Sequence, residues 1–423
     1  MSKTVVALAG LGTIGAGLAK LLCENPAAGK VLRLKSVLVR DLSKPRALPH
    51  GTIVSNKASE IVEDPEVDVV VEALGGVESA FAVVESALKA GKHVVTANKN
   101  LLAEKGPELF ALARQKGVSL GFEASVCAGI PIIRTLREAL RAETILSVEG
   151  IVNGTTNYIL TRMSENASSY TDALREAQEK GYAEPDPSYD VSGKDAACKA
   201  TILTSLAFGH FFPTDRIRTS GISNLDSQDV SQAEAMGYRI KLIAAARRTK
   251  NGQVDVEVAP VLLPKEHPLA SVRLEYNAVL VDSTGLGLTL YSGKGAGPAP
   301  TAVSLLADLM DVAQGRALLV EEENGFLHRQ ENFECDRTQL ERFYIHLSVP
   351  DLPGVLAKVA GVLAAQGVSL ASVLQPEVKS DAEGLVPLIL TTHQAQRGRL
   401  DAALAELGKE GWGKGVVLRI QDV

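Results

Sequence analysis

The chain has 423 residues, of which 46% are hydrophobic and 22% are charged, and its formal net charge is -6. This length allows about two to four domains, and the mild acidity argues against a nucleic-acid partner. No apolar stretch reaches the roughly 18 residues that a membrane span needs, so no membrane partner is expected.

The cysteines and the N-terminus both favour a cytoplasmic setting. Cys23, Cys127, Cys198 and Cys335 are scattered and show no metal-site or disulfide spacing, which is typical of a protein in a reducing compartment. The first residues lead directly into an apolar strand, so no secretory leader is expected.

The first third of the chain alternates segments of strand and helix character. Helical spacing of apolar residues occurs at Gly15–Leu22, Val77–Ala90 and Gly106–Lys116. Short buried runs predict strands at Thr4–Ala9, Leu34–Val39, Val67–Ala73, His93–Thr96 and Ser119–Phe122. This alternation predicts an α/β domain with a Rossmann-type, doubly wound parallel sheet over residues 1–130.

A glycine-rich turn follows the first expected strand. The run Gly10-Leu11-Gly12-Thr13-Ile14-Gly15 matches G-x-G-x-x-G and lies between a strand and a helix, the context that makes this motif specific. The first glycine permits a tight turn, the second lets a pyrophosphate approach the backbone, and the third lets helix and strand pack closely. Because the helix N-terminus offers N–H groups to phosphates, the turn predicts a nicotinamide dinucleotide site. A tight turn without a ligand is the alternative.

The end of the second expected strand bears on the choice between NADP and NAD. Arg40 stands where NAD-binding folds usually carry a carboxylate, and an arginine there can pair with a 2′-phosphate. Asp41 can still serve NAD, and a solvated surface charge is the alternative for Arg40. The pattern favours NADP. Gly75 follows the strand Val67–Ala73, at the same ligand-binding edge of the sheet.

Two further polar segments follow strands of this sheet. Lys99 lies at the same edge, where it is either a functional ammonium or an ordinary surface lysine. The small-residue loop Glu123–Pro131 offers a carboxylate and several backbone carbonyls, a donor set suited to a hard cation, although a plain loop is the simpler interpretation. Cys127 has no histidine nearby in the sequence, so we do not expect it to be a nucleophile.

The middle of the chain predicts an α+β domain over residues 131–300. Its expected elements are a helix at Pro131–Arg141 and, around a long irregular and helical stretch, strands at Ser147–Val152, Val254–Leu263, Asn277–Val281 and Gly285–Tyr291. A helix at Thr301–Gln314 follows a loop rich in glycine and proline, and we expect it to return to the first domain.

The richest polar segment is Gly181–Lys199. It carries Glu184, Asp190 and Asp195 on and after a proline-rich loop. Asp195 and Lys199 are four residues apart and share one face of the following helix. A lysine at the mouth of a buried helix can have a lowered pKa and act as a general acid or base in an alcohol–carbonyl interconversion, while Glu184 and Asp190 can bind a substrate ammonium. An ordinary salt bridge is the alternative.

The last part of the chain predicts a small βαββαβ unit over residues 341–423, preceded by a charged linker at 321–340. Helices are expected at Pro353–Ala365 and Leu400–Lys409. Strands are expected at Arg342–Val349, Val368–Gln375, Leu385–Thr392 and Val416–Ile420. This order is typical of a ferredoxin-like fold.

Several of these segments together resemble the homoserine dehydrogenase family. The resemblance covers about residues 1 to 320 in order, and its most specific parts are Asn-Gly-Thr-Thr-Asn at 153–157 and Glu-Pro-Asp-Pro at 184–187. The other matching segments are Gly10–Gly15, Thr96–Lys99, Glu123–Pro131, Gly193–Lys199 and Gly293–Gly297. The resemblance implies NAD(P)-dependent interconversion of L-homoserine and L-aspartate 4-semialdehyde, a step toward threonine, methionine and isoleucine.

The resemblance also assigns roles to individual residues. It implies that Lys199 donates a proton to the aldehyde oxygen and that Lys99 lies near the nicotinamide. The residues that it places at the substrate are Glu184, Asp195 and Asp190. At the cofactor, the glycine turn and the strand ends predict Gly10, Gly12, Thr13, Ile14, Gly15, Arg40 and Gly75, and the resemblance adds Lys99 and Gly295. Those that it places around a sodium ion are the Glu123 carboxylate and the carbonyls of Val126, Ala128 and Ile130.

The C-terminal unit resembles an ACT domain. The resemblance rests on the segment Val349–Ala357 and on the βαββαβ order. Such domains usually pair and bind amino acids at their interface. The resemblance therefore implies feedback regulation with L-threonine as the effector, and a homodimer or homotetramer.

Two alternatives stay open from the sequence alone. Another dehydrogenase with an ACT domain, such as a 2-hydroxyacid type, needs a catalytic histidine and arginine, whereas His93 falls within an expected buried strand. A non-catalytic sensor of cofactor and amino-acid levels can be built from the same modules. Such a sensor has no need for Lys99, Glu184, Asp195 and Lys199 together.

Overall fold

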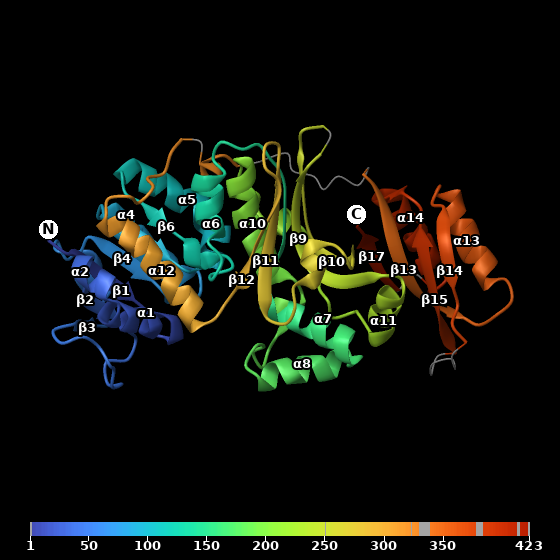
Figure 1. Cartoon of the computed structure of the whole chain (residues 1–423), viewed down its shortest axis with the longest axis horizontal. Coiled ribbons are helices and arrows are strands. Elements are labelled where there is room, and N and C mark those ends of the chain that lie inside the picture. The colour runs from blue at the N-terminus through green and yellow to red at the C-terminus, as the bar shows by residue number, and fades with distance from the viewer. Residues whose placement is uncertain are drawn as a thin grey trace.

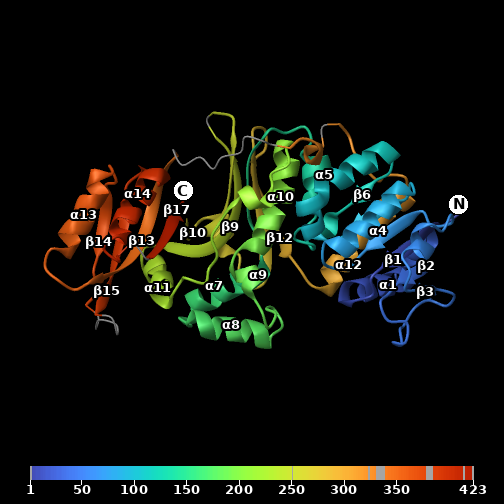
Figure 2. The same cartoon turned by 180° about the vertical axis from the view of Figure 1, so that it is seen from behind.

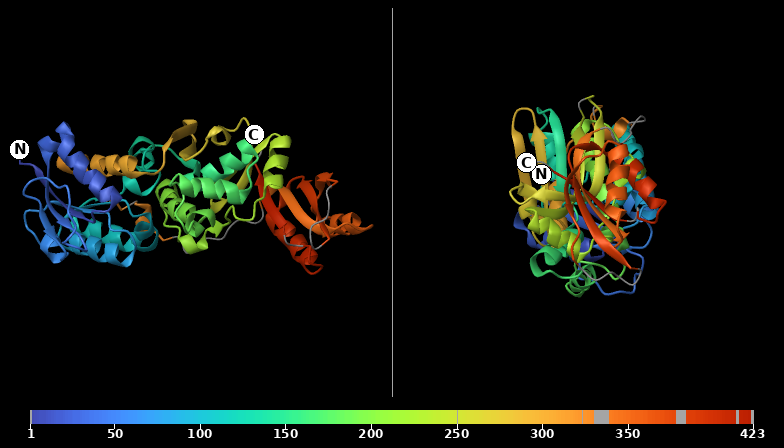
Figure 3. Two further views of the ribbon diagram at one scale, coloured as in Figure 1. Left: turned by 90° about the horizontal axis from the view of Figure 1, so that it is seen from below. Right: turned by 90° about the vertical axis from the view of Figure 1, so that its right-hand side faces the viewer.

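The computed structural model describes residues 2–249, 251–322, 324–329, 339–377, 384–412 and 415–421. The molecule is elongated, and an N-terminal, a central and a C-terminal unit follow one another along its long axis (Figures 1 and 2). The view from below shows the same succession (Figure 3). Within the described residues, no helix has the length and apolar character needed to cross a membrane.

The N-terminal unit is built on a parallel sheet with the strand order β3-β2-β1-β4-β5-β6. Its strands are β1 Thr4–Ala9, β2 Leu32–Leu38, β3 Ile53–Ser55, β4 Val69–Glu72, β5 His93–Thr96 and β6 Leu120–Gly121. The direction of winding reverses between β1 and β4, where a doubly wound sheet binds ligands at the carboxyl ends of its strands. The Rossmann-type prediction is confirmed.

Helices cover both faces of this sheet because its strands are buried on both sides. They are α1 Thr13–Glu24, α2 Pro26–Val31, α3 Ser59–Val62, α4 Glu78–Lys89 and α5 Lys99–Lys116. Val5 and Ala7 of β1 pack in the cluster that contains α4 and α5, whereas Val6 and Leu8 pack in the cluster that contains α1. Helix α12, Pro298–Ala313, comes back from the central unit and packs against α1, as expected (Figure 1).

The central unit is built on antiparallel strands in the order β12-β11-β7-β9-β10. Their bounds are β7 Ile145–Ile151, β9 Tyr238–Arg248, β10 Val254–Pro264, β11 Tyr276–Ser283 and β12 Gly287–Lys294, and the short β8 Arg218–Thr219 pairs with β10. The sequence pattern does not predict β9. Its seven consecutive buried residues include Lys241, so neither alternation nor a continuous apolar run marks it as a strand.

Helices pack on this sheet and carry the polar segment singled out in the sequence. They are α7 Gly154–Asn166, α8 Tyr170–Glu179, α9 Ser188–Val191, α10 Lys194–Phe208 and α11 Ser227–Ala235. Helix α10 contacts β7, β9 and β10 on one side and α5 of the N-terminal unit on another. The helix expected at Pro131–Arg141 is instead the short α6 Ile132–Arg134 followed by a π-helical turn at Thr135–Ala139.

The C-terminal unit has the expected βαββαβ order. It consists of β13 Leu340–Pro350, α13 Val355–Ala365, β14 Leu370–Leu374, β15 Leu385–Thr392, β16 Ala395–Gln396, α14 Arg397–Gly408 and β17 Gly415–Ile420. Strand β17 pairs with β13 and also, in parallel, with β10, where Val261 lies opposite Arg419 and Leu262 opposite Ile420. The central and C-terminal sheets are therefore one continuous sheet among the described residues.

The linker expected at 321–340 is only partly visible. Residues 323 and 330–338, Cys335 among them, lie outside the described residues. The described part is not a free connection, because Phe326 lies fully buried in a 3-10 turn at Gly325–Leu327. Its ring stacks on Phe110 of α5 with the ring centroids 4.4 Å apart.

Candidate active site

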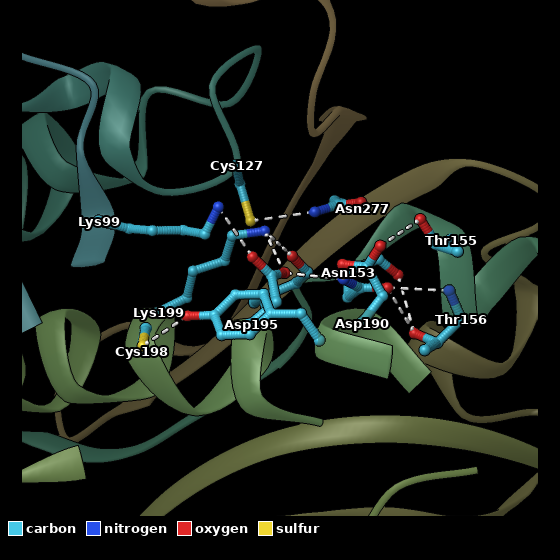
Figure 4. A network of polar contacts seen from close by, with 12 residues as sticks. Lys99, Cys127, Asn153, Thr155, Thr156, Asp190, Asp195, Cys198, Lys199 and Asn277 are labelled. Atoms are coloured by element: carbon cyan, nitrogen blue, oxygen red, sulfur yellow. Dashed lines mark hydrogen bonds and ion pairs between the residues drawn. The ribbon is translucent and has the colours of Figure 1, made fainter. Parts of the chain in front are cut away.

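Two lysines from different units meet at one carboxylate. Nζ of Lys199 lies 2.8 Å from Oδ2 of Asp195 on the same face of α10, and Nζ of Lys99, the first residue of α5, lies 3.0 Å from Oδ1 (Figure 4). Asp195 is only 3% exposed and Lys199 only 8%. The pair expected from the sequence is thus a buried charge cluster at the junction of two units, rather than a surface salt bridge.

The charges in this cluster fix its protonation states. Burial opposes ionisation of Asp195, but the positive charges of Lys199 and Lys99 prevail and lower the pKa of Asp195 far below its ordinary value. Burial also opposes the charged form of Lys199, but the charge of Asp195 prevails and raises the pKa of Lys199. The expected lowering of the Lys199 pKa is wrong. The side chain is therefore held as an ammonium, the protonated form that a proton donor needs.

Asp190 joins the cluster through Asn153, the first residue of the 153–157 segment, to which the sequence analysis assigned no role. The Asn153 side-chain amide donates to Oδ1 of Asp190 at 2.8 Å and to Oδ2 of Asp195 at 2.7 Å (Figure 4). The carbonyl oxygen of the preceding residue, Val152, accepts a hydrogen bond from Lys199 at 2.6 Å. The available signal was the position of Asn153, a residue type that caps helices, between a strand and the helix α7.

Glu184 lies apart from this cluster. It is exposed on the loop before α9, and its backbone carbonyl accepts a hydrogen bond from Gln178. Its carboxylate makes no hydrogen bond or ion pair within the described part of the chain. The structure therefore brings Lys99, Asp190, Asp195 and Lys199 together but leaves Glu184 at the rim.

The glycine turn between β1 and α1 has the geometry that its motif predicts. A Cβ on Gly10, whose φ is +100°, would lie 2.3 Å from the Ala73 carbonyl oxygen, and a Cβ on Gly15 would lie 2.1 Å from the Gly10 oxygen. These two glycines are needed for packing. Gly12 instead borders open space and precedes Thr13 and Ile14, the first residues of α1, without any side-chain cap. The N–H groups at the start of α1 are thus free to meet a phosphate.

Two other glycines assigned to the cofactor lie on separate loops. Gly75 follows β4 with a φ of +75° and has open space where a Cβ would stand. Gly295 is held against the central unit, because a Cβ there would lie 2.0 Å from Cγ of Asn277. The sequence did not single out Glu72 at the end of β4, although its buried carboxylate joins β4 to β5 through Thr96.

The loop after β2 separates two candidate recognition groups. Arg40 is exposed, and its guanidinium has no hydrogen bond or ion pair in the described part of the chain. The carboxylate of Asp41 accepts hydrogen bonds from the hydroxyl and the N–H of Ser43, which lower the pKa of Asp41. A second arginine, Arg46, donates to the Asp41 carbonyl oxygen. Asp41 is therefore occupied within its own turn, while the loop presents arginine side chains.

Glu123 lies buried against the start of α6. Its carboxylate accepts hydrogen bonds from two backbone N–H groups at 2.8 and 3.1 Å, and burial raises its pKa. In the same loop the Ala128 carbonyl accepts a hydrogen bond from Ser304. Together with the carbonyls of Val126 and Ile130 the donor set is all oxygen, and each oxygen has a second lone pair. A buried carboxylate on a loop that also offers backbone carbonyls is a donor set whose chemistry fits a hard cation.

Cys127 is fully buried in this loop. The Asn277 amide donates to its sulfur at 3.3 Å, and burial raises the pKa of the thiol (Figure 4). These surroundings favour a neutral thiol, in agreement with the expectation that Cys127 is no nucleophile.

His93 has a structural role. It bonds to Ser119 at the amino-terminal end of β5, away from the ligand-binding edge, which removes the support for a 2-hydroxyacid type of site.

Comparison with known proteins identifies each unit. Residues 10–123 match the family model of the homoserine dehydrogenase NAD binding domain, residues 131–310 that of homoserine dehydrogenase, and residues 343–409 that of the ACT domain. The homoserine dehydrogenase of Pseudomonas aeruginosa is 42% identical over 100% of this chain and 99% of its own length. These matches follow the chain in the order of its structural units.

Solved structures of homoserine dehydrogenases superimpose on this chain as well. A homoserine dehydrogenase from Thiobacillus denitrificans superimposes with a TM-score of 0.90 at 39% identity, covering 100% of this chain and 99% of that one. A hyperthermophilic archaeal homoserine dehydrogenase in complex with NADPH superimposes with a TM-score of 0.64 at 28% identity, covering 76% of this chain and 100% of that one. The chain therefore belongs to the homoserine dehydrogenase family of NAD(P)-dependent oxidoreductases and carries a C-terminal ACT domain.

Proposed function

We propose that Lys199 is the proton donor when L-aspartate 4-semialdehyde is reduced to L-homoserine. The bound nicotinamide cofactor supplies the hydride to the carbonyl carbon and accepts it in the reverse direction. As the C=O bond becomes a C–O–H group, the Lys199 ammonium gives its proton to the oxygen, and the neutral amine takes it back when homoserine is oxidised. The observation that carries this proposal is the buried Lys99–Asp195–Lys199 cluster.

Lys99 has a supporting role in this proposal. It reaches Asp195 from the start of α5, at the carboxyl edge of the parallel sheet where the cofactor is expected. Its side chain is 32% exposed, so the ammonium borders the space where substrate and nicotinamide meet. Asp190 and the exposed Glu184 are proposed to bind the substrate ammonium, with Glu184 approaching only when the substrate is present.

The test is an assay of L-homoserine with NAD+ and with NADP+ that follows the absorbance of the reduced cofactor. Turnover is expected with at least one of them. L-Serine, which is one methylene shorter, is the control and should react far more slowly. Absence of homoserine turnover with either cofactor would contradict the proposal.

NADP is the proposed preferred cofactor, with NAD as the weaker one. Support comes from Arg40, whose guanidinium is exposed at the end of β2, and from Asp41, whose carboxylate is engaged by Ser43 instead of being free for ribose hydroxyls. The archaeal relative solved with NADPH agrees with this preference.

A sodium ion held by Glu123 and the carbonyls of Val126, Ala128 and Ile130 would keep the loop before α6 in place.

L-Threonine is the proposed effector of the C-terminal unit, which would make the step subject to feedback within threonine, methionine and isoleucine biosynthesis. The hollow at Val349–Leu356 is bordered by Gln375, whose amide donates to Asp351 at 3.2 Å. The same unit reaches the catalytic sheet through Gln421, which donates to Glu149 of β7. Strand β7 leads directly to Asn153, so a shift of this strand would move the active site.

A homodimer, or a homotetramer if the ACT units also pair, is the proposed assembly. Strand β12 lies at one end of the continuous sheet, and it and its preceding turn expose Leu286, Leu288 and Leu290, which are 58%, 63% and 44% exposed. A row of exposed leucines on an edge strand is typical of an interface.

The proposed cellular location is the cytoplasm.

The proposed division of labour follows the chain. Residues 1–130, completed by the returning helix near 301–320, bind the cofactor. Residues 131–300 bind the substrate and form the dimer, residues 321–340 connect, and residues 341–423 regulate. Phe326, which packs on Phe110, would tie the connecting segment to the cofactor unit.

A further inference from the structure

Asn153 uses all of its side-chain hydrogen-bonding capacity in one place. Its Oδ1 accepts from the N–H of Thr156 at 2.8 Å and from the Thr156 hydroxyl at 2.9 Å. Its Nδ2 donates to Asp190 at 2.8 Å and to Asp195 at 2.7 Å. The residue is buried, so water does not replace any of these partners (Figure 4).

The orientation of this amide is determined by chemistry. The Thr156 N–H can only donate, so it requires the oxygen of Asn153 on its side. The two carboxylates can only accept while they are ionised, so they require the NH2 group. The reversed amide would place a donor against a donor and an oxygen against two anions. The helix cap of α7 therefore fixes a double donor between Asp190 and Asp195.

The two carboxylates differ in their other partners. Asp195 has ammonium groups on both oxygens, from Lys99 and Lys199. Asp190 has no ion pair within the described residues, and its second oxygen lies 3.2 Å from the Thr155 hydroxyl. The charged groups that face Asp190 are Asp195 and Lys199 of α10, while α7 contributes only neutral donors.

The groups around Asp190 shift its pKa in opposite directions. On balance the pKa of Asp190 is raised: burial and the charge of Asp195 raise it, and the Asn153 donation, the charge of Lys199 and the Thr155 hydroxyl offset only part of that effect. Asn153 is the first of the opposing contributions. It is also the group that joins the two carboxylates directly.

We infer that Asn153 is a positioning residue of the active site, which orients Asp190 beside the Asp195–Lys199 pair and favours its ionised form so that Asp190 can receive the substrate ammonium. This inference rests on the proposed function. Asn153 does not touch the reacting atoms; it acts through Asp190 and, on the shared oxygen of Asp195, through Lys199. The neutral amide separates two carboxylates without neutralising the charge that the substrate ammonium is to meet.

The first variant is Asn153→Ser, because serine is also a good helix cap but lacks the double donor. The expected result is a KM for homoserine raised roughly tenfold to a hundredfold, which is what loss of a hydrogen bond to a charged group costs. The KM for the cofactor should stay within about twofold, and the acid limb of the kcat/KM profile should move to higher pH, by about one unit. Asn25→Ser, at the cap of α2, is the matched control because Asn25 bonds only to backbone N–H groups.

The second variant, Asn153→Asp, keeps the shape and the cap but replaces both donations by repulsion, and it should lose more than Asn153→Ser. It decides the question if the serine variant is unstable. The third readout is 4-oxobutanoate, an aldehyde substrate analogue without the ammonium. The difference in KM between wild type and variant should largely disappear with this compound if Asn153 acts through Asp190.

The outcomes separate the two levels of the proposal. If the wild-type enzyme does not turn over homoserine, the proposed function fails before any variant is made. If the wild type is active and both Asn153 variants keep the wild-type KM and acid limb, with only a lower melting temperature, Asn153 is a helix cap and the inference is overturned. A KM penalty of equal size with 4-oxobutanoate would also overturn it.

Discussion

The ammonium of Lys99 lies 3.0 Å from Oδ1 of Asp195, so a residue of the cofactor-binding unit is ion-paired with a residue of the catalytic unit. The other oxygen of the same carboxylate holds Lys199. One buried anion thus aligns a lysine from each side of the junction where, in the proposed mechanism, hydride and proton arrive together. It also keeps Lys199 protonated in a site whose burial would otherwise remove that proton.

Substitution Asp195→Asn should show this effect on Lys199 in the pH profile. Without the negative charge, burial dominates and the pKa of Lys199 falls. Lys199 would then lose its proton at lower pH, so the alkaline loss of semialdehyde reduction should begin at lower pH than in the wild type. We expect kcat to fall by roughly 10²–10⁴-fold. An unchanged alkaline limb would show that Asp195 does not control the protonation of Lys199.

Substitution Arg40→Ala tests the cofactor preference. If Arg40 pairs with the 2′-phosphate, its loss should raise the KM for NADP by about tenfold or more and leave the KM for NAD nearly unchanged. Arg33→Ala, on the strand β2 that precedes the Arg40 loop and paired with Glu66, is the control and should change neither. Steady-state kinetics with both cofactors give the answer. An equal effect of Arg40→Ala on both cofactors would show that Arg40 does not select between them.

Substitution Glu123→Gln tests the proposed sodium site. In the wild type, replacing sodium by choline in the buffer should lower activity several-fold and lower the melting temperature. The glutamine variant lacks the charge that compensates the cation and should show little response to sodium. Glu138→Gln, an exposed carboxylate nearby, should respond as the wild type does. A full sodium response in Glu123→Gln would show that Glu123 does not bind the sodium ion.

The contact between the ACT and catalytic units should depend on pH through His346. Nδ1 of His346 on β13 lies 2.7 Å from Oδ1 of Asp229 on α11, and the Tyr344 hydroxyl donates to the same oxygen. Burial would lower the pKa of His346, but the hydrogen bond and charge of Asp229 raise it above its ordinary value of 6.5. Since the pKa is raised in the folded state, this contact stabilises fully below about pH 6.5 and loses its contribution as the pH rises through the folded-state pKa.

The measurement is the free energy of unfolding of wild type and His346→Gln from pH 5 to 9. The difference should be largest at the acid end, on the order of 1–3 kcal/mol, and shrink as the pH rises. His393→Gln, an exposed histidine of the same unit, should show no such trend. A difference that is constant over the range would mean that the charge of His346 does not hold the units together.

Much of the fold could be predicted because its signals are local. The glycine turn, the βαβ alternation and the βαββαβ order each depend on residues close in sequence, and the structure confirms them. Strand β9 escaped prediction because buried polar partners allow a lysine such as Lys241 inside a strand; its Nζ donates to Asn157 and to the Val272 carbonyl, and burial lowers its pKa to about 7. The joining of β17 to β10 is a contact between distant segments that no local pattern reveals.

The same division holds for the site. The i,i+4 spacing of Asp195 and Lys199 correctly predicted that they share a helix face. The direction of the Lys199 pKa shift depends instead on the balance between burial and the charge of Asp195, which spacing does not reveal. The role of Asn153 was missed for a related reason, although the residue begins the 153–157 segment that carries the resemblance. An asparagine before a helix is expected to cap it, and here it does, so nothing in the sequence shows that its other end holds two carboxylates.

The central claim is that Lys199 transfers the proton, and kcat of Lys199→Ala tests it most directly. The variant should retain NADPH binding, measured by fluorescence titration, to within about twofold, while kcat for homoserine falls by roughly 10²–10⁴-fold. Lys194→Ala, an exposed lysine at the start of the same helix, should keep the wild-type rate. A near-normal kcat in Lys199→Ala, with the protein folded and the cofactor bound, would contradict the claim.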